Sequence, residues 1–254
     1  MTALDEDRIQ ATLDRLHAAA ERDMPAIAAG LLRSFGKPRP ADMANAYIAV
    51  SRKQGQLLYA LARSIRATNV VEFGASFGIS AVWLGAAARD NGGRVVTTEI
   101  EPNKVEAARR NLAEAGLDDV VTLLAGDARE TLRPHEGPVD LLYLDGWSDL
   151  YFDILALMEP KLRVGATVLM DNASFPRVQP FLRHLRQSPR YVSSALQTDK
   201  FPMELAVFLG AGEERTGNTN GPPALHPLSL HPRARRPQAR PGRRSTPSGP
   251  QNRA

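Results

Sequence analysis

The stretch "NVVEFGASFGIS", Asn69–Ser80, decides the fold, because it runs from a strand pattern through a glycine-containing loop into a helix pattern. Its first part is rich in β-branched residues and almost wholly apolar, which is typical of a parallel strand buried on both faces. Gly74 and Gly78 flank the loop and let the backbone approach a ligand, and the helix start offers free N–H groups. The stretch therefore predicts a ligand site after this strand, with a plain strand-to-helix turn as the alternative.

Further strand patterns follow, and helix patterns separate them. The strand patterns are "RVVTTEI" (Arg94–Ile100), "VVTLLAG" (Val120–Gly126), "VDLLYLDG" (Val139–Gly146) and "ATVLMDN" (Ala166–Asn172), with helices expected near 78–89, 102–115, 128–132 and 150–162. This alternation predicts an α/β protein with a doubly wound, Rossmann-like, mostly parallel sheet. Only "DKFP" separates "RYVSSALQT" from "MELAVFLG", so these two should form a C-terminal antiparallel hairpin.

Charge and proline content separate residues 211–254 from the rest of the chain. This segment holds 8 of the 19 prolines and eight arginines against two glutamates, whereas residues 1–210 hold 24 basic and 26 acidic side chains. We expect 211–254 to be a disordered Pro/Arg-rich tail. The tail could bind RNA or anionic lipid weakly, but the acidic balance of 1–210 argues against a large nucleic-acid footprint.

The length and composition of the chain limit which kinds of protein it can be. The chain has 254 residues, no cysteine and no apolar run near the ~18 residues of a membrane span. Its first residues lack the features of a signal peptide, so a cytoplasmic protein is expected. We read 1–44 as an N-terminal helical cap and 45–210 as the catalytic domain. The N-terminal helices could cover the site or form a homodimer interface.

Acidic residues stand at the ends of the first three strands, where doubly wound sheets bind ligands. Glu72 would attract a cationic amine and repel a pyrophosphate. Glu99 can accept hydrogen bonds from both ribose hydroxyls, a feature that NAD-binding and nucleoside-binding folds share. The glycine fingerprint of a dinucleotide site is absent, which disfavours an NAD-linked dehydrogenase. Asp127 could accept from an adenine amino group or cap the next helix.

Three short oxygen-bearing side chains follow the fourth and fifth strands: Asp145, Asp171 and Asn172. Neighbouring strands lie about 4.8 Å apart, so these side chains can converge on one point. Mg²⁺ and similar hard cations prefer oxygen ligands of this kind. The alternative is that Asp-Gly and Asp-Asn are ordinary turn formers.

The order of "EFGASFGIS", "TTEIEP", "AGDA", "YLDGWSDLY" and "LMDN" resembles the cation-dependent O-methyltransferases that use S-adenosylmethionine (SAM), catechol O-methyltransferases above all, over roughly residues 45–210. The resemblance implies a class I methyltransferase fold, with Trp147 packed on the adenine. Asp145, Asp171 and Asn172 would act catalytically by holding Mg²⁺ or another divalent cation. The residues that it places around SAM are Val50, Glu72, Gly74, Ser76, Gly78, Ser80, Glu99, Ile100, Asp127, Ala128, Asp145 and Trp147.

One position departs from the family. The resembling enzymes carry a lysine, read as the general base, three residues after the metal-binding aspartate, and here that position is Ser148. A serine cannot serve as that base unaided. The metal alone could lower the substrate pKa, Lys200 or Glu204 could replace the lysine, the substrate could be acidic already, or the protein could be a slow or inactive relative. Tyr151 matches the family.

The leading hypothesis is therefore a SAM- and metal-dependent O-methyltransferase of a small phenolic substrate with two adjacent hydroxyls. A hydroxylated tRNA base is the alternative substrate, because relatives of the family methylate such bases. A catalytically weak SAM-binding relative is the third reading, and it rests on Ser148 alone.

Overall fold

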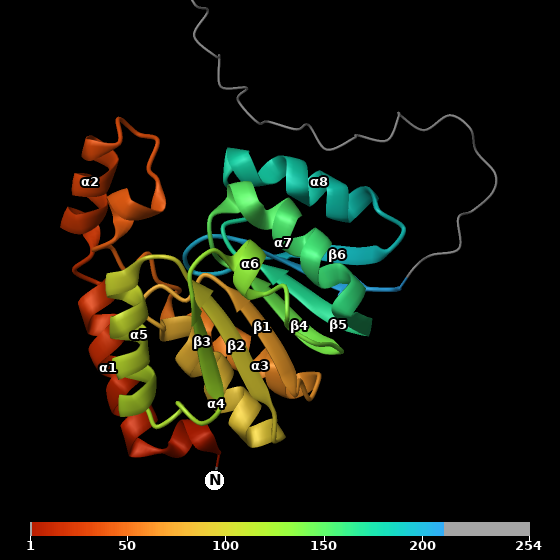
Figure 1. Ribbon diagram of the computed structural model, residues 1–254, viewed down its shortest axis with the longest axis horizontal. Coiled ribbons are helices and arrows are strands. Elements are labelled where there is room, and N and C mark those ends of the chain that lie inside the picture. The colour runs from red at the N-terminus through yellow and green to blue at the C-terminus, as the bar shows by residue number, and fades with distance from the viewer. Residues whose placement is uncertain (1, 211–254) are drawn as a thin grey trace, which may run out of the picture. The chain divides into compact units, whose positions relative to one another are not determined.

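The computed structural model describes residues 2–210, which form a seven-stranded sheet in the order β3-β2-β1-β4-β5-β7-β6 (Figure 1). The strands β1 to β5 pair in parallel, and β7 is antiparallel to both β5 and β6. This confirms the predicted doubly wound sheet and its C-terminal hairpin. The strands are β1 (Asn69–Phe73), β2 (Arg94–Glu99), β3 (Val121–Ala125), β4 (Val139–Leu144), β5 (Leu162–Met170), β6 (Tyr191–Leu196) and β7 (Met203–Phe208).

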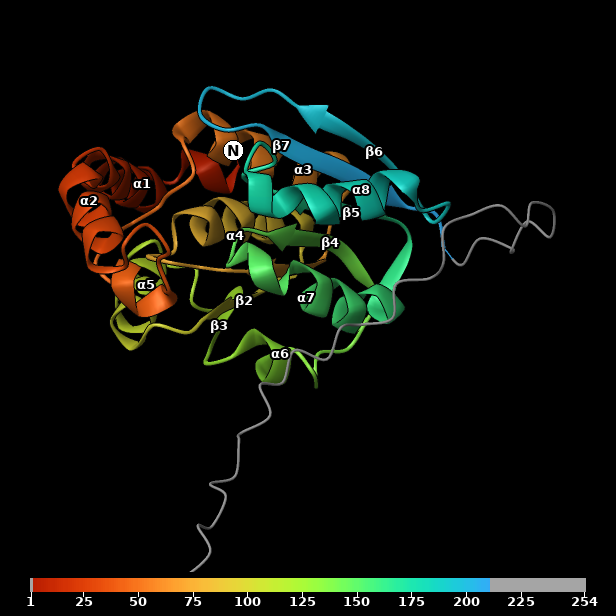
Figure 2. The same ribbon diagram turned by 90° about the horizontal axis from the view of Figure 1, so that it is seen from above.

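Helices cover both faces of this sheet (Figure 2). Side chains alternate between the two faces along a strand, so Val70 joins one apolar cluster and Val71 the other. Both faces of β1 and β4 are buried, as their apolar runs predict. One face carries α3 (Arg52–Ser64), α4 (Ile79–Asn91) and α5 (Pro102–Glu114); the other carries α6 (Ala128–Thr131), α7 (Tyr151–Met158) and α8 (Gln179–Gln187).

The strand β3 is less buried than its sequence pattern predicts. Thr122 and Ala125 are exposed, because β3 is an edge strand with β2 as its only neighbour in the sheet. The strand β5 begins four residues before the predicted Ala166, at Leu162, and its first part is only partly buried.

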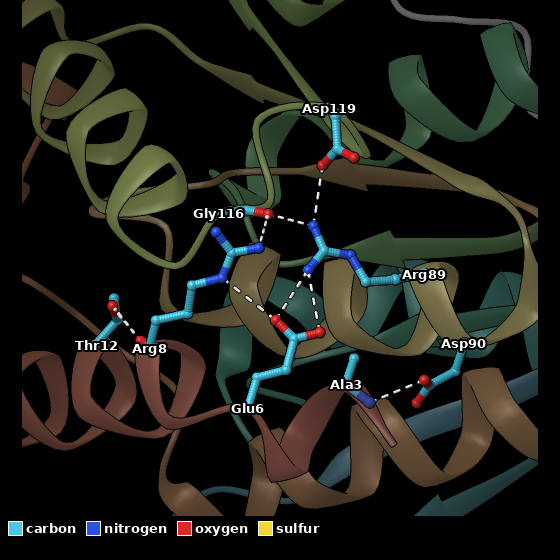
Figure 3. Close-up of polar contacts among 8 residues, drawn as sticks. All are labelled: Ala3, Glu6, Arg8, Thr12, Arg89, Asp90, Gly116 and Asp119. Atoms are coloured by element: carbon cyan, nitrogen blue, oxygen red, sulfur yellow. Dashed lines mark hydrogen bonds and ion pairs between the residues drawn. The ribbon is translucent and has the colours of Figure 1, made fainter. Parts of the chain in front are cut away.

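Two helices, α1 (Asp7–Ala20) and α2 (Met24–Arg33), precede α3, as expected for the N-terminal region. The start of the chain is fixed to the body by ionic contacts (Figure 3). Arg89 bonds Glu6 at 3.3 Å, Asp119 at 3.0 Å and the carbonyl of Gly116, and Arg8 donates to the same carbonyl at 3.3 Å. The N-terminal helix α1 is therefore held against α4 and α5.

Residues 24–46 leave this body and return to it, and we call them the N-terminal excursion. The Asp23 carboxylate closes its base, accepting from the backbone N–H of Tyr47 at 2.8 Å and of Ile48 at 2.9 Å. Within α2 only Gly30 is buried, and Figure 1 shows the helix standing away from the sheet.

Short 3-10 helices complete the described region. None of the helices in residues 2–210 is both long and apolar enough to cross a membrane. The predicted disordered tail, 211–254, lies outside the described residues. The 3-10 helices are η1 (Ala3–Asp5), η2 (Pro40–Met43), η3 (Ser148–Leu150), η4 (Glu159–Lys161) and η5 (Pro176–Val178).

Candidate active site at the carboxyl ends of the strands

A cavity of about 1290 Å³ lies at the carboxyl ends of the central strands, large enough for a cofactor together with a small substrate. Side chains of α1 and α2 also line it, so the N-terminal helices do cover the site. Glu72, Gly78 and Asp171 do not line the cavity. The predicted site residues that line the cavity are Val50, Gly74, Ser76, Ser80, Glu99, Ile100, Asp127, Ala128, Asp145, Trp147, Ser148 and Asn172.

The loops after β1 and β4 meet at two glycines. Gly74 has a φ of +102°, and a Cβ built on it would lie 2.6 Å from the Cα of Gly146. A Cβ on Gly146 would lie 2.6 Å from the ring of Phe73. The N–H of Asp145 also donates to the Phe73 carbonyl at 2.9 Å. The Asp-Gly turn is thus built to let two strand-end loops touch.

Glu99, at the end of β2, is held by three backbone donors. Its carboxylate accepts from the N–H of Ser76 at 2.8 Å, Ile100 at 2.8 Å and Glu101 at 2.9 Å. Ser76 is fixed in turn, because its hydroxyl donates to the Tyr47 carbonyl at 2.7 Å. A carboxylate oxygen has lone pairs beyond these bonds, so a rigid Glu99 can still accept from hydroxyls in the cavity.

Glu72 is fully buried within β1. One carboxylate oxygen accepts from the hydroxyl of Thr97, and the other has no hydrogen-bond partner in the described region. Burial raises the pKa of Glu72 to about 7, against the lowering effect of the neighbouring hydroxyls of Ser80 and Thr97. A buried acceptor without a partner is costly, and a cationic amine would satisfy it. Glu72 therefore fits the amino group of SAM.

Gly78 and Asp127 both begin helices. Gly78, with a φ of +89°, is the N-cap residue of α4. The Asp127 carboxylate caps α6 by accepting from the N–H of Arg129 at 2.9 Å, and it pairs with that residue's guanidinium at 2.6 Å. The capping alternative for Asp127 is thereby confirmed, and the residue also faces the cavity.

Asp145, Asp171 and Asn172 converge as expected. Leu144 and Met170 are partners in the β4–β5 ladder, so the residues that follow them lie side by side. The side-chain amide of Asn172 donates to Asp171 at 3.2 Å. Burial and the charge of Asp171 raise the pKa of Asp145 well above its usual range, and burial raises the pKa of Asp171.

This donor set fits a hard divalent cation. Two carboxylates and an amide oxygen are ligands of the kind Mg²⁺ prefers, and a cation between the carboxylates would offset their repulsion. Residues 2–210 contain no group of three or more His, Cys, Asp or Glu side chains able to hold a metal. Asn172, whose side chain contacts Asp171, would supply a third protein ligand beside Asp145 and Asp171.

The sequence-based reasoning missed Gln54, which positions Asp171. Its buried amide donates to the Asp171 carboxylate at 3.1 Å and to the carbonyl of Phe201 at 3.2 Å. Its carbonyl oxygen accepts from the N–H of Ser51 at 2.9 Å, closing a capping box at the start of α3. The S-x-x-Q spacing at 51–54 signals that cap, but the contact with Asp171 spans 117 residues and leaves no local signal.

Lys200 and Glu204, the two residues considered as replacements for the family's lysine at position 148, lie in different environments. Lys200 lines the cavity with Ser148, donates to the Ala49 carbonyl at 2.6 Å, and counteracts the rise in the pKa of Asp171. Glu204 is fully buried in β7 and bound by Arg186 at 2.6 Å, and it does not line the cavity. The expectation that Glu204 could enter the site is wrong.

Known proteins are similar to this chain in sequence and in fold. Residues 71–173 match a family described as "Methyltransferase domain". Catechol O-methyltransferase of Sus scrofa is 30% identical over 176 residues, which cover 64% of this chain and 94% of the pig protein. The chain belongs to the catechol O-methyltransferase family. The resemblance to this family that the sequence motifs indicate is thereby confirmed.

Two further relatives support this membership of the catechol O-methyltransferase family. The catechol O-methyltransferase of Mycobacterium tuberculosis is 38% identical over 151 residues, covering 59% of this chain and 66%, just under two thirds, of that protein. The O-methyltransferase of Bacillus cereus, solved in complex with SAH, is 25% identical with a TM-score of 0.62, covering 78% of this chain and 90% of its own. Structures with bound SAH support SAM as the cofactor.

Proposed function

We propose that this protein transfers the methyl group of SAM to one hydroxyl of a small aromatic that carries two adjacent hydroxyls, with Mg²⁺ or another divalent cation bound. The observation that carries the proposal is the buried pair Asp145 and Asp171, whose raised pKa values reflect burial and, for Asp145, its neighbour's charge. Asn172 stands beside them and, like Asp145, lines the cavity that also contains Glu99.

The reaction needs little more than charge and position. A phenol has a pKa of about 10, so ionising it at pH 7 costs roughly 4 kcal/mol. A divalent cation, when bound, supplies the positive charge that favours the ionised hydroxyl. Asp145, Asp171 and Asn172 would hold that cation. Glu72 and Glu99 would hold the amino and ribose ends of SAM, so that the methyl group faces the hydroxyl in line.

We further propose that Lys200 takes over the role of the lysine that Ser148 replaces. Lys200 lies in the loop between β6 and β7 and lines the cavity. Its charge counteracts the rise in the pKa of Asp171, so it acts electrostatically on one of the two proposed metal-binding carboxylates. A lysine placed there can stabilise the phenolate or, when neutral, accept its proton.

The test is methyl transfer from SAM to catechol by the purified protein, with and without EDTA. We expect activity that EDTA abolishes and Mg²⁺ restores, and no activity in Asp171→Ala. The control is Asp153→Ala, since Asp153 is an exposed carboxylate of α7 whose nearest ion pair, to Arg129, spans 3.7 Å. Methylation that survives both EDTA and Asp171→Ala contradicts the proposed role of the metal.

A further inference from the structure

Lys104 is a buried cation that faces the cavity without a partner. It lies in the first turn of α5, is only 5% exposed, and lines the cavity. Its ammonium lies 5.6 Å from the ring centroid of Phe77, and within residues 2–210 it forms no hydrogen bond and no ion pair. A buried charge is normally hydrogen-bonded, and a lysine in the first turn also opposes the helix dipole. Because Lys104 lines the cavity, a group bound there can supply this partner.

The surroundings of Lys104 indicate what that partner is. Burial lowers its pKa, while the carboxylates of Glu99, Asp23 and Glu101 act in the opposite direction. Asp145 acts in the same direction, so four acids surround one ammonium, and the negative local charge disfavours an anionic ligand such as a phosphate or a carboxylate. A neutral oxygen that can accept a hydrogen bond is the partner that suits both the lysine and the acids.

Glu99 and Lys104 together satisfy a hydroxyl group. A hydroxyl has one proton to donate and two lone pairs that accept. Glu99 is fixed by three backbone donors and can take the proton, while Lys104 can donate to a lone pair. The Phe77 ring beneath Lys104 is itself stacked on Tyr47, with centroids 4.1 Å apart, so the ammonium has a rigid support.

We propose that Lys104 is a cofactor-binding residue whose ammonium donates to a ribose hydroxyl oxygen of SAM, opposite the acceptor Glu99. The inference rests on the SAM-binding part of the proposed function, and it is independent of the metal and of the aromatic substrate. Glu99 would accept hydrogen bonds from the ribose hydroxyls, and Lys104 would donate a hydrogen bond to a hydroxyl oxygen. Together the two residues would select a ribose with both hydroxyls present.

The test compares binding of SAH with that of its 2′-deoxy and 3′-deoxy ribose analogues by calorimetry. We expect Lys104→Met to bind SAH about tenfold more weakly, the loss of one charged hydrogen bond. For the analogue that lacks the contacted hydroxyl, the wild type and Lys104→Met should bind equally. Arg110→Met, an exposed cation on the same helix, should bind SAH as the wild type does.

An equal loss for SAH and both deoxy analogues, or no loss at all, overturns the inference. Lys104→Gln, a shorter neutral donor, carries the same comparison if Lys104→Met does not fold. A wild type that binds SAH but methylates no catechol would reject the proposed function and leave this test intact. The two failures are therefore distinguishable.

Discussion

Gly74 and Gly146 are in direct backbone contact, since a Cβ on Gly74 would lie 2.6 Å from both the Cα and the N of Gly146. The first glycine belongs to the loop that faces the proposed cofactor, and the second follows the proposed metal ligand Asp145. Their contact would hold the proposed cofactor and metal sites at a constant separation, which a displacement reaction requires.

Gly74→Ala should therefore damage both folding and binding. The left-handed φ and the clash with Gly146 predict a loss of roughly 2 to 4 kcal/mol in the free energy of unfolding, measured in urea, and weaker SAH binding. Gly36→Ala is the matched control, because Gly36 also has a positive φ, +76°, but has open space where a Cβ would go. Its expected loss is only about 1 kcal/mol. Equal effects of the two substitutions would contradict the proposed contact.

Glu72 should make the free protein less stable as the pH rises. Its pKa is about 7 in the folded state against 4.5 for the unfolded chain, so the folded state binds the extra proton between these values. The free energy of unfolding should fall by about 3 kcal/mol across that window. Glu72→Gln should remove this part of the slope, as urea titrations at pH 5 and pH 8 would show.

The same residue predicts the pH dependence of binding. Because the ionised carboxylate suits the cationic amine, SAH should bind more tightly as the pH rises through about 7. Calorimetry in buffers of different ionisation enthalpy would detect proton release on binding at pH 6.5 in the wild type. Proton release that persists unchanged in Glu72→Gln would assign the linkage to another group.

Gln54→Leu should weaken metal binding while SAH binding is retained. The substitution removes the amide that holds Asp171 at 3.1 Å and leaves the volume similar. Loss of a residue that orients a metal ligand typically lowers metal affinity 10- to 100-fold. The Mg²⁺ concentration at half-maximal activity measures this effect. Gln56→Leu, an exposed neighbour on the same helix, serves as the control.

Lys200→Met should lower kcat about 100-fold or more at neutral pH if Lys200 replaces the family's lysine, and it should leave the Kd for SAH unchanged. Lys53→Met is the control, because Lys53 is exposed on α3 and does not line the cavity. A variant whose kcat equals that of the wild type would exclude Lys200 from the reaction.

Ser148→Lys restores the residue that the resembling enzymes carry at this position. We expect kcat to rise, and Lys200→Met to become harmless in this background, because two lysines would then serve one role. Ser148→Met, of similar length but without the amine, should not raise kcat. The pH profile of kcat measures the change, since an added base alters the ascending limb.

Local patterns were sufficient for the fold. The continuous apolar runs of β1 and β4 predict strands buried on both faces, and the four-residue gap before Met203 predicts the hairpin. The pattern misled at β3, because an edge strand and a central strand can have the same composition. Position within a sheet is a property of the whole topology, and no single segment encodes it.

The site was predictable where it follows strand ends and unpredictable where it depends on distant packing. Asp145, Asp171 and Asn172 follow strands that neighbour each other, so their convergence could be inferred. No local pattern in the sequence marks Lys104, which is buried because distant parts of the folded chain cover it.

His17 and Glu204 show the same limit. His17 is buried where α1 meets α4 and accepts from the indole of Trp83 at 3.3 Å, a contact between distant segments that has no local signal in the sequence. Burial lowers its pKa to about 4. The side chain of Glu204 is bound by Arg186 of α8.

The hydrogen bonds to Asp23 make the N-terminal excursion a segment that can be replaced without changing the rest of the fold. Its two ends are joined by short hydrogen bonds from Tyr47 and Ile48, so the chain enters and leaves at one point. The free energy of closing a longer loop rises only slowly with its length. Residues 24–46 can therefore be shortened, extended or exchanged between relatives while the sheet and Glu99 keep their places. Because residues of this segment line the cavity, changes in it offer a way to redesign the cavity for new substrates.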